Sequence, residues 1–292
     1  MLKAPFIAFI VIFFYAYPPV AFSCVNNFID VDKLSADALR GLSPLVVQNL
    51  LRKEVRKLTE EKIQALTSEQ IEVFPTERLL VSQIPFFTAA QSNSIIVRLL
   101  KREDEFIASV FIRTHMPHIF LNTISLITKK EIRRWSVSDI KNLTQKQIAV
   151  FTPEQMQAFA IGQIPVFLPS QIQAFTPKQI PFFTNAQLAA FSTEQIQALT
   201  AIQLKALTPE QMQAFAIGQI PVFLPSQIQA FTPKQIQNMG PWWIKAFLPS
   251  QIQALLPEQL QALTHTQAQT LKSYQLKAIT SAQLDILTFK YL

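Results

Sequence analysis

The 292-residue sequence contains one cysteine, four glycines and three histidines, and only 15% of its residues are charged. A single cysteine excludes an intramolecular disulfide, so stability must come from packing. His115, His118 and His265 have no neighbouring cysteine or further ligand at metal-binding spacing, so we expect surface or partly packed side chains. Glycine-rich phosphate loops, the nucleophile elbow and the H-E-x-x-H motif are also missing from the sequence. We therefore predict a protein that is not an enzyme and that has no cofactor.

An eight-residue repeat dominates the sequence instead. From Thr128 to Leu287 the chain consists of twenty consecutive octets with the consensus T-x-x-Q-I-x-A-F/L, and every octet has apolar residues at positions five and eight. Position one is Thr or Ser in twelve octets, position four is Gln in seventeen, and position two is Pro in nine. Such a regular period indicates a repeat architecture in which each unit contacts its neighbours.

Each octet carries the signals that begin a helix. A hydroxyl at position one and a glutamine at position four form the S/T-x-x-E/Q capping box, and proline at position two occupies the first helical site. One continuous helix is excluded, because eight residues advance it by about 800° and the apolar stripe would rotate by roughly 80° per repeat. A β-solenoid is disfavoured by the repeated Gln and Ala. The sequence therefore predicts an all-α fold, an elongated solenoid of helices of one to two turns, one per octet.

Two details of this solenoid can be predicted. The octets 160–167 and 216–223 have proline at position six, Pro165 and Pro221, and no hydroxyl at position one, so we expect a single turn, of α or 3₁₀ type, followed by an extended step. We expect positions five, seven and eight to face the core, and an outward face made mostly of Gln, Lys, Pro and Thr.

The N-terminal 23 residues do not belong to the array. Lys3 precedes an apolar run from Phe6 to Tyr17, which predicts a signal peptide for residues 1–23, with an uncleaved anchor as the alternative. Cleavage would expose Cys24 as a candidate lipidation site, and cleavage without lipidation is the alternative. We expect residues 24–34 to form a cap or linker.

The octet frame extends through most of the remaining chain. Residues 35–127 form degenerate octets, preceded by a plausible first octet at 27–34 and interrupted by a five-residue slip at 75–79, and 128–292 form the regular solenoid. Thr152 to Ile180 recurs residue for residue as Thr208 to Ile236, an offset of seven octets. A duplication by whole octets lengthens a solenoid without breaking its frame.

Three groups of residues are candidate partner contacts. Two are basic clusters that contain Arg52 and Lys53 in one segment and Lys129, Lys130, Arg133 and Arg134 in another; the third is the pair Trp242 and Trp243. A basic surface suits an anionic lipid or envelope polymer, and the alternative is a solvated face with interleaved glutamates. An exposed tryptophan pair suits a protein partner, and the alternative is a structural filling of a bend. The modest net charge of +7 and the predicted export disfavour nucleic acid as a partner.

The octets 192–199 and 208–215 resemble the L-T-x-x-Q-I-x-A-L octapeptide arrays of bacterial exported and surface-associated proteins. The resemblance covers most of residues 35–292 and implies a spacer or binding stalk. We therefore predict an exported, non-enzymatic scaffold that binds protein or envelope components, at the cell envelope or outside the cell. One alternative is a membrane-active protein that binds lipid or forms pores. Another is an enzyme with its site in residues 92–127.

Overall fold

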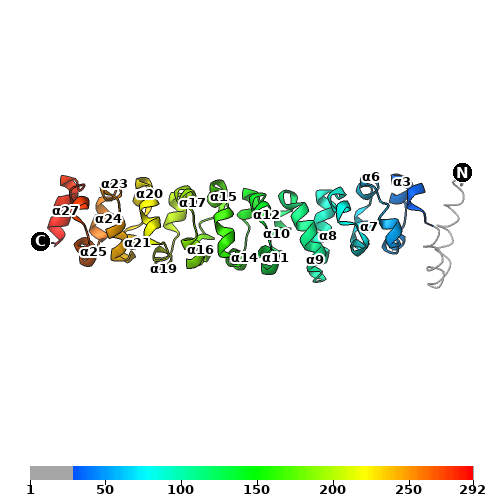
Figure 1. Ribbon diagram of the computed structural model, residues 1–292, viewed down its shortest axis with the longest axis horizontal. Coiled ribbons are helices and arrows are strands. Elements are labelled where there is room, and N and C mark those ends of the chain that lie inside the picture. The colour runs from blue at the N-terminus through cyan, green and yellow to red at the C-terminus, as the bar shows by residue number, and fades with distance from the viewer. Residues whose placement is uncertain (1–28, 292) are drawn as a thin grey trace. The chain divides into compact units, whose positions relative to one another are not determined.

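The structure is a computed structural model that describes residues 29–291, and every regular element within that range is a helix, most of them one or two turns long (Figure 1). The chain divides into two compact units, with the division between Ile119 and Phe120. This division lies one octet before the boundary at residue 128 that the regularity of the sequence suggested. The predicted signal peptide and Cys24 lie outside the described residues.

The first unit contains α-helices of four to six residues, short 3₁₀ helices (η) and two longer helices, α8 and α9. Its elements are η2 (Val31–Lys33), α3 (Ala36–Arg40), α4 (Pro44–Gln48), α5 (Arg52–Val55), α6 (Glu60–Gln64), α7 (Ser68–Val73), η3 (Thr76–Arg78), η4 (Val81–Phe86), α8 (Ala89–Lys101), α9 (Glu105–Thr114) and η5 (Met116–His118).

The second unit has one short helix per octet up to its final helix, α27. Its elements are α10 (Leu121–Ile124), α11 (Lys129–Ile132), α12 (Val137–Lys141), α13 (Gln145–Ile148), α14 (Pro153–Ala158), η6 (Ile161–Val166), α15 (Pro169–Ala174), η7 (Ile180–Phe182), α16 (Asn185–Ala189), α17 (Thr193–Ala198), α18 (Ala201–Lys205), α19 (Pro209–Met212), η8 (Ile217–Val222), α20 (Pro225–Ala230), α21 (Pro233–Asn238), α22 (Pro241–Ala246), α23 (Pro249–Gln253), α24 (Pro257–Ala262), α25 (His265–Gln269), α26 (Ser273–Leu276) and α27 (Ser281–Tyr291). The predicted all-α repeat solenoid is confirmed.

The capping box begins these helices as predicted. In the octet of α14, the Gln155 backbone amide donates to Thr152 Oγ1 at 3.3 Å, and the Thr152 amide donates to Gln155 Oε1 at 3.0 Å. Phe159 and Ala160 then adopt extended conformations (φ −59°, ψ 125° and φ −65°, ψ 152°), which turn the backbone into the next octet. Pro165 and Pro221 lie in the 3₁₀ helices η6 and η8, one of the two helix types expected for octets with proline at position six.

Positions five and eight supply the core, as predicted. Their side chains are buried throughout the octets from 128 to 263. The position-eight phenylalanines form an edge-to-face ladder, in which Phe159, Phe167, Phe175 and Phe183 have successive ring centroids 5.0–5.5 Å apart. Edge-to-face contacts stabilise aromatic pairs beyond the burial of their surface.

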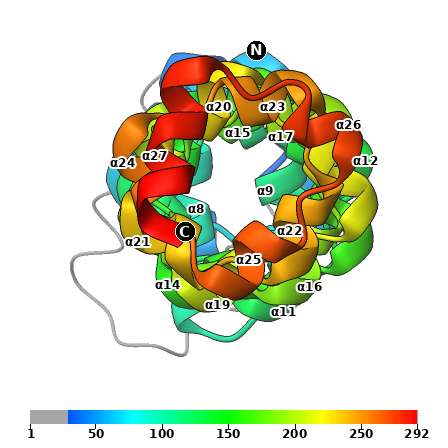
Figure 2. The same cartoon turned by 90° about the vertical axis from the view of Figure 1, so that its left-hand side faces the viewer.

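The octets wind into a superhelix of between three and four octets per turn. Helices three octets apart lie side by side, such as α11 with α14 and α15 with α17. The side chain of Gln203 reaches back four octets, where its Nε2 donates to the carbonyl oxygens of Ile172 and Phe175 at 2.8 and 2.7 Å. Seven octets therefore span about two turns, and α11, α16 and α22, which are seven octets apart, fall in the same sector of the end-on view (Figure 2).

Candidate binding surface

The position-four glutamines form an amide clamp, defined here as the bonds from one position-four side chain to two carbonyls of the octet four units earlier. Every such glutamine from Gln155 to Gln283 donates through Nε2 to the carbonyls 31 and 28 residues before it, at 2.7–3.2 Å. These carbonyls belong to positions five and eight. The same side chain caps its own helix through Oε1, so that all its polar atoms are used.

The clamp corrects one expectation from the sequence. Glutamine was expected on the outward face. Position-six glutamines such as Gln157 and Gln229 are exposed, but at position four Gln195, Gln251 and Gln275 are at most 1% exposed and nearly all their counterparts are buried. Burial is possible because each amide satisfies three backbone groups, and buried polar groups without partners are costly. The outer surface is therefore built from positions two, three and six, and from position one in octets such as those of Leu168, Leu224 and Leu248.

In the first unit Gln70, Gln83 and Gln91 form the same clamp, and other long donors act at two further places. Arg98 donates to the carbonyls of Ile71, Glu72 and Phe74, and Arg78 donates to those of Gln48 and Leu50. The carbonyls lie four units earlier in both cases when residues 75–79 are counted as one shortened octet. Residues 75–79 therefore act as one shortened unit whose helix is η3. The octets after them keep the same superhelical register as the octets before them.

The first clamp along the described chain is formed by Lys62, four octets after the octet of Val31. The octets that begin at residues 35, 43 and 51 carry Ala38, Val46 and Glu54 at position four. The next octet carries Lys62, whose Nζ donates to the Val31 carbonyl at 2.9 Å, 31 residues earlier. The octet after that carries Gln70. The plausible first octet at 27–34 thus supplies the first clamped carbonyl.

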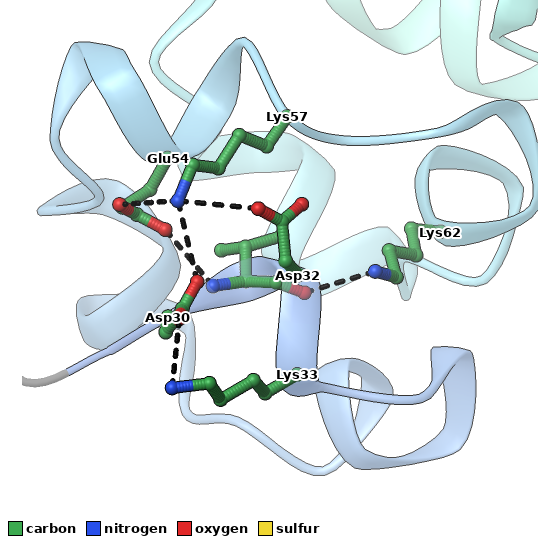
Figure 3. A network of polar contacts seen from close by, with 7 residues as sticks. Asp30, Asp32, Lys33, Glu54, Lys57 and Lys62 are labelled. Carbon is green, nitrogen blue, oxygen red and sulfur yellow. Dashed lines mark hydrogen bonds and ion pairs between the residues drawn. The ribbon is translucent and has the colours of Figure 1, made fainter.

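A polar network closes this end of the first unit (Figure 3). Buried Glu54 accepts the Val31 amide through Oε2 at 2.9 Å. Lys57 Nζ lies 3.2–3.4 Å from carboxylate oxygens of Asp30, Asp32 and Glu54. Hydrogen bonds from Lys33 and Lys57 hold the pKa of Asp30 below its usual value, and the bond to Asp30 raises the pKa of Lys57. These carboxylates are occupied by structural bonds.

His115 belongs to the interior of the first unit. It is 6% exposed, stacks on Phe111, and places Nδ1 3.1 Å from the Phe111 carbonyl oxygen and Nε2 3.2 Å from that of Phe87. Phe87 is the position-eight residue four octets earlier, so His115 occupies the place of a clamp glutamine. Burial lowers the pKa of His115, and the two carbonyls offset this only in part. His118 is exposed. No group of three metal-ligating side chains occurs within residues 29–291.

The two basic clusters lie in different units. Arg52 and Lys53 are exposed on α5, and Lys129, Lys130, Arg133 and Arg134 are exposed around α11. The glutamates between them, Glu54 and Glu131, are buried at position four. The alternative of a solvated face with interleaved glutamates is therefore wrong for these two glutamates, and Glu54 pairs with Lys57 of its own cluster at 3.4 Å.

The tryptophan pair is mainly structural. Trp243 is fully buried, so its prediction as a partner contact is wrong. It replaces a clamp glutamine, with Nε1 donating to the Met212 carbonyl at 2.8 Å, and its ring packs among those of Phe215, Phe223 and Phe231. Trp242 is only half-buried, and its ring folds back against the backbone of Gly240.

Comparison with known families gives one match. The model described as the ALTTAQ repeat matches residues 183–216, which include α16, α17, α18 and α19 with their junctions. No curated protein matches the chain. No helix within residues 29–291 is both long and apolar enough to cross a membrane. The match supports tandem repeats, and it covers a small part of the chain.

Sequence reasoning identified the glutamines as capping residues and missed their second role. The position-four residues gave only a weak signal of that role. Ala38 and Val46 precede the first clamp donor, Lys62, but Thr123 and Asp139 also stand in place of the glutamine, which becomes regular only from Gln147 onward.

Proposed function

We propose that this protein is an exported, non-enzymatic repeat scaffold that binds a protein or envelope component through its outer surface. The amide clamp is the observation that supports this proposal best. It places the recurring position-four glutamines inside the solenoid, where they hold the fold together and take no part in binding. The exposed positions two, three and six vary from octet to octet and are free to differ without disturbing the core. Solenoids of this kind offer extended surfaces for binding.

Binding of purified protein to isolated envelope fractions tests this proposal. Charge substitutions at exposed position-six residues, such as Gln157→Glu or Gln229→Glu, should weaken binding without lowering the melting temperature. Core substitutions should abolish both together. Undiminished binding by every surface variant, or a hydrolytic activity lost on replacing His115 or His118, would contradict the scaffold.

Export and lipidation require their own test. Labelled palmitate should be incorporated by the wild-type chain and not by Cys24→Ala if Cys24 becomes a lipidated N-terminus. Fractionation of both forms then separates an envelope-anchored protein from a freely secreted one. Retention of the unprocessed chain inside the cell would rule out the signal peptide.

An anionic lipid surface is the second candidate partner, supported by the exposed cations around α11. Vesicles with anionic headgroups should sediment with the wild-type protein and less with Lys129→Glu/Arg133→Glu. The matched control, Lys205→Glu/Lys234→Glu, changes the net charge equally at exposed positions elsewhere. Equal binding by both double variants would show attraction by total charge alone. Leakage of the vesicle contents would favour the membrane-active alternative.

A further inference from the structure

One side of the second unit carries lysines and no acidic residue. We call it the lysine face and define it by six octets, which are 144–151, 168–175, 176–183, 200–207, 224–231 and 232–239. The charged residues of these octets are Lys146, Lys178, Lys205 and Lys234, and all four are exposed. The other six octets between residues 144 and 239 contain three glutamates and no lysine or arginine. Charge is therefore segregated between the two sets of octets.

Packing and the amide clamp bring the six octets together. Helix α13 packs beside α15, and α18 packs beside α20. The clamps of Gln179, Gln203 and Gln235 each hold an earlier octet of the face to a later one. Helices α15 and α20, which are seven octets apart, fall in the same sector of the end-on view (Figure 2). The lysine face is therefore continuous along the second unit.

The four lysines are not engaged by carboxylates of their own chain. Within residues 29–291, none of their ammonium groups forms an ion pair or a hydrogen bond, whereas Lys33 and Lys57 of the first unit are paired. Glutamates of the second unit are held at the starts of their own helices, as Glu194 accepts the Ser192 hydroxyl at 2.9 Å. The charge of the lysine face is therefore available to a partner.

Exposed apolar side chains lie among the lysines. Leu168 and Leu224 are 40% and 41% exposed, and Ile202, on α18 between them, is 66% exposed. Both leucines stand at position one, where the consensus hydroxyl caps the helix, and neither side chain makes a cap. The missing cap costs about 1 kcal/mol, which favours a role for the leucines outside the stability of the chain.

Glutamates border the lysine face and limit the shape of its partner. Helix α14 with Glu154 packs beside η7, α17 with Glu194 packs beside α15, and α19 with Glu210 and α24 with Glu258 pack beside α21. A broad anionic surface such as a bilayer would meet these carboxylates together with the lysines and would be repelled by them. A narrow chain that follows the face meets only the lysines and the apolar side chains.

We propose that the lysine face binds an acidic protein segment, whose carboxylates pair with the lysines and whose apolar side chains contact Leu168, Ile202 and Leu224. Complementary charge of this kind selects a partner and speeds its association. A protein segment is favoured over a phosphate polymer, because the polymer has no apolar groups for the leucines to contact. This inference rests on the proposed scaffold function and names the chemistry of its protein partner.

Fluorescence anisotropy with the full-length protein and a labelled synthetic peptide of glutamate and leucine tests the charge. At physiological ionic strength, Lys178→Glu/Lys234→Glu should bind about tenfold more weakly than the wild type and keep its melting temperature, because both positions are exposed. The matched control, Lys129→Glu/Arg133→Glu, reverses as many charges on α11, outside the face, and should bind like the wild type. A wild type that does not bind, or equal losses in the two variants, overturns the proposal.

Serine substitutions separate binding from stability. Leu168→Ser/Leu224→Ser restores two capping hydroxyls, so the melting temperature should hold or rise while binding of the peptide weakens. The matched control is Leu248→Ser/Leu256→Ser, which restores two capping hydroxyls on α23 and α24, outside the six octets, and should leave binding unchanged. Polyglutamate bound as tightly as the glutamate and leucine peptide would overturn the assignment to a protein segment.

Two further outcomes separate this proposal from the scaffold function. If envelope fractions bind the wild type and Lys178→Glu/Lys234→Glu equally, the lysine face is overturned and the scaffold function stands. If anionic vesicles bind the wild type and no longer bind this double variant, a lipid surface replaces the acidic protein segment. Loss of peptide binding in Lys178→Glu/Lys234→Glu, with vesicle binding unchanged, is the result expected.

Discussion

At the scale of single residues, one glutamine per octet links local and long-range structure. Its Oε1 begins its own helix, and its Nε2 holds two carbonyls of the octet four units earlier. Both contacts must be broken when the side chain is removed. The cost should therefore exceed that of losing an ordinary helix cap.

Gln203→Ala should lower the free energy of unfolding by about 2–3 kcal/mol, because it leaves the carbonyls of Ile172 and Phe175 buried without the Gln203 donor. Gln203→Glu keeps an oxygen for the cap and loses the donor, so it should be at least as destabilising. Chemical denaturation measures both. Gln229→Ala, at an exposed position six, should change stability by less than about 0.5 kcal/mol. Equal effects at the two positions would disprove the clamp.

His115 gives the first unit a dependence on pH. Because burial lowers its pKa below 6.5, the unfolded chain binds a proton more readily than the folded chain. Stability of the first unit should be greatest above pH 6.5 and fall as the pH decreases through and below 6.5. His115→Gln should remove this component, which thermal melts between pH 5 and 8 can measure. The same fall in both proteins would assign the effect to other groups.

At the scale of elements, each octet carries enough information for its own helix. The threonine and glutamine of the capping box, the proline at position two and the apolar residues at five and eight were sufficient to predict the solenoid, and proline at position six marked η6 and η8 as unusual. The sequence did not predict the number of octets per turn, because that depends on which carbonyls the glutamines reach. It also misplaced Trp243, since an indole can donate to Met212 as a clamp glutamine would.

Helix α22 begins with a glycine whose role is local. A Cβ on Gly240 would lie 2.1 Å from Nε1 of Trp242. Gly240→Thr restores the consensus at position one but should lower the melting temperature, because the indole must move. Adding Trp242→Glu, the residue found at this position in α14, should recover the stability. A melting temperature that rises in the single variant would show that the ring moves at no cost.

At the scale of the whole molecule, stability is distributed along the array. Within each described unit the octets contact neighbours three and four units away, so stability is shared among many local contacts, as in other repeat proteins. The candidate binding surface was less predictable than the fold. Whether a lysine or a tryptophan is exposed depends on its position in the octet and on superhelical packing, and the period alone does not give the packing.

Removal of residues 152–207 should leave a folded protein. This deletion takes out seven octets, and the junction from Phe151 to Thr208 has the same following sequence as the junction from Phe151 to Thr152. The melting temperature should change by only a few degrees. Removal of residues 152–204 leaves residues 205–207 between two octets, so the clamps across this junction lose their register and the melting temperature should fall further. Equal stability of the two shortened proteins would contradict the frame dependence.

The direction of the clamp also orders events in time. A carbonyl pair in one octet can be secured only after the glutamine four octets later has left the ribosome. At a synthesis rate of about 5–20 residues per second, that interval is roughly 2–6 s. During this interval several octets carry formed helix caps without long-range bonds. During synthesis, therefore, the four most recently made octets always lack their clamps, and a chaperone would meet the chain in this state.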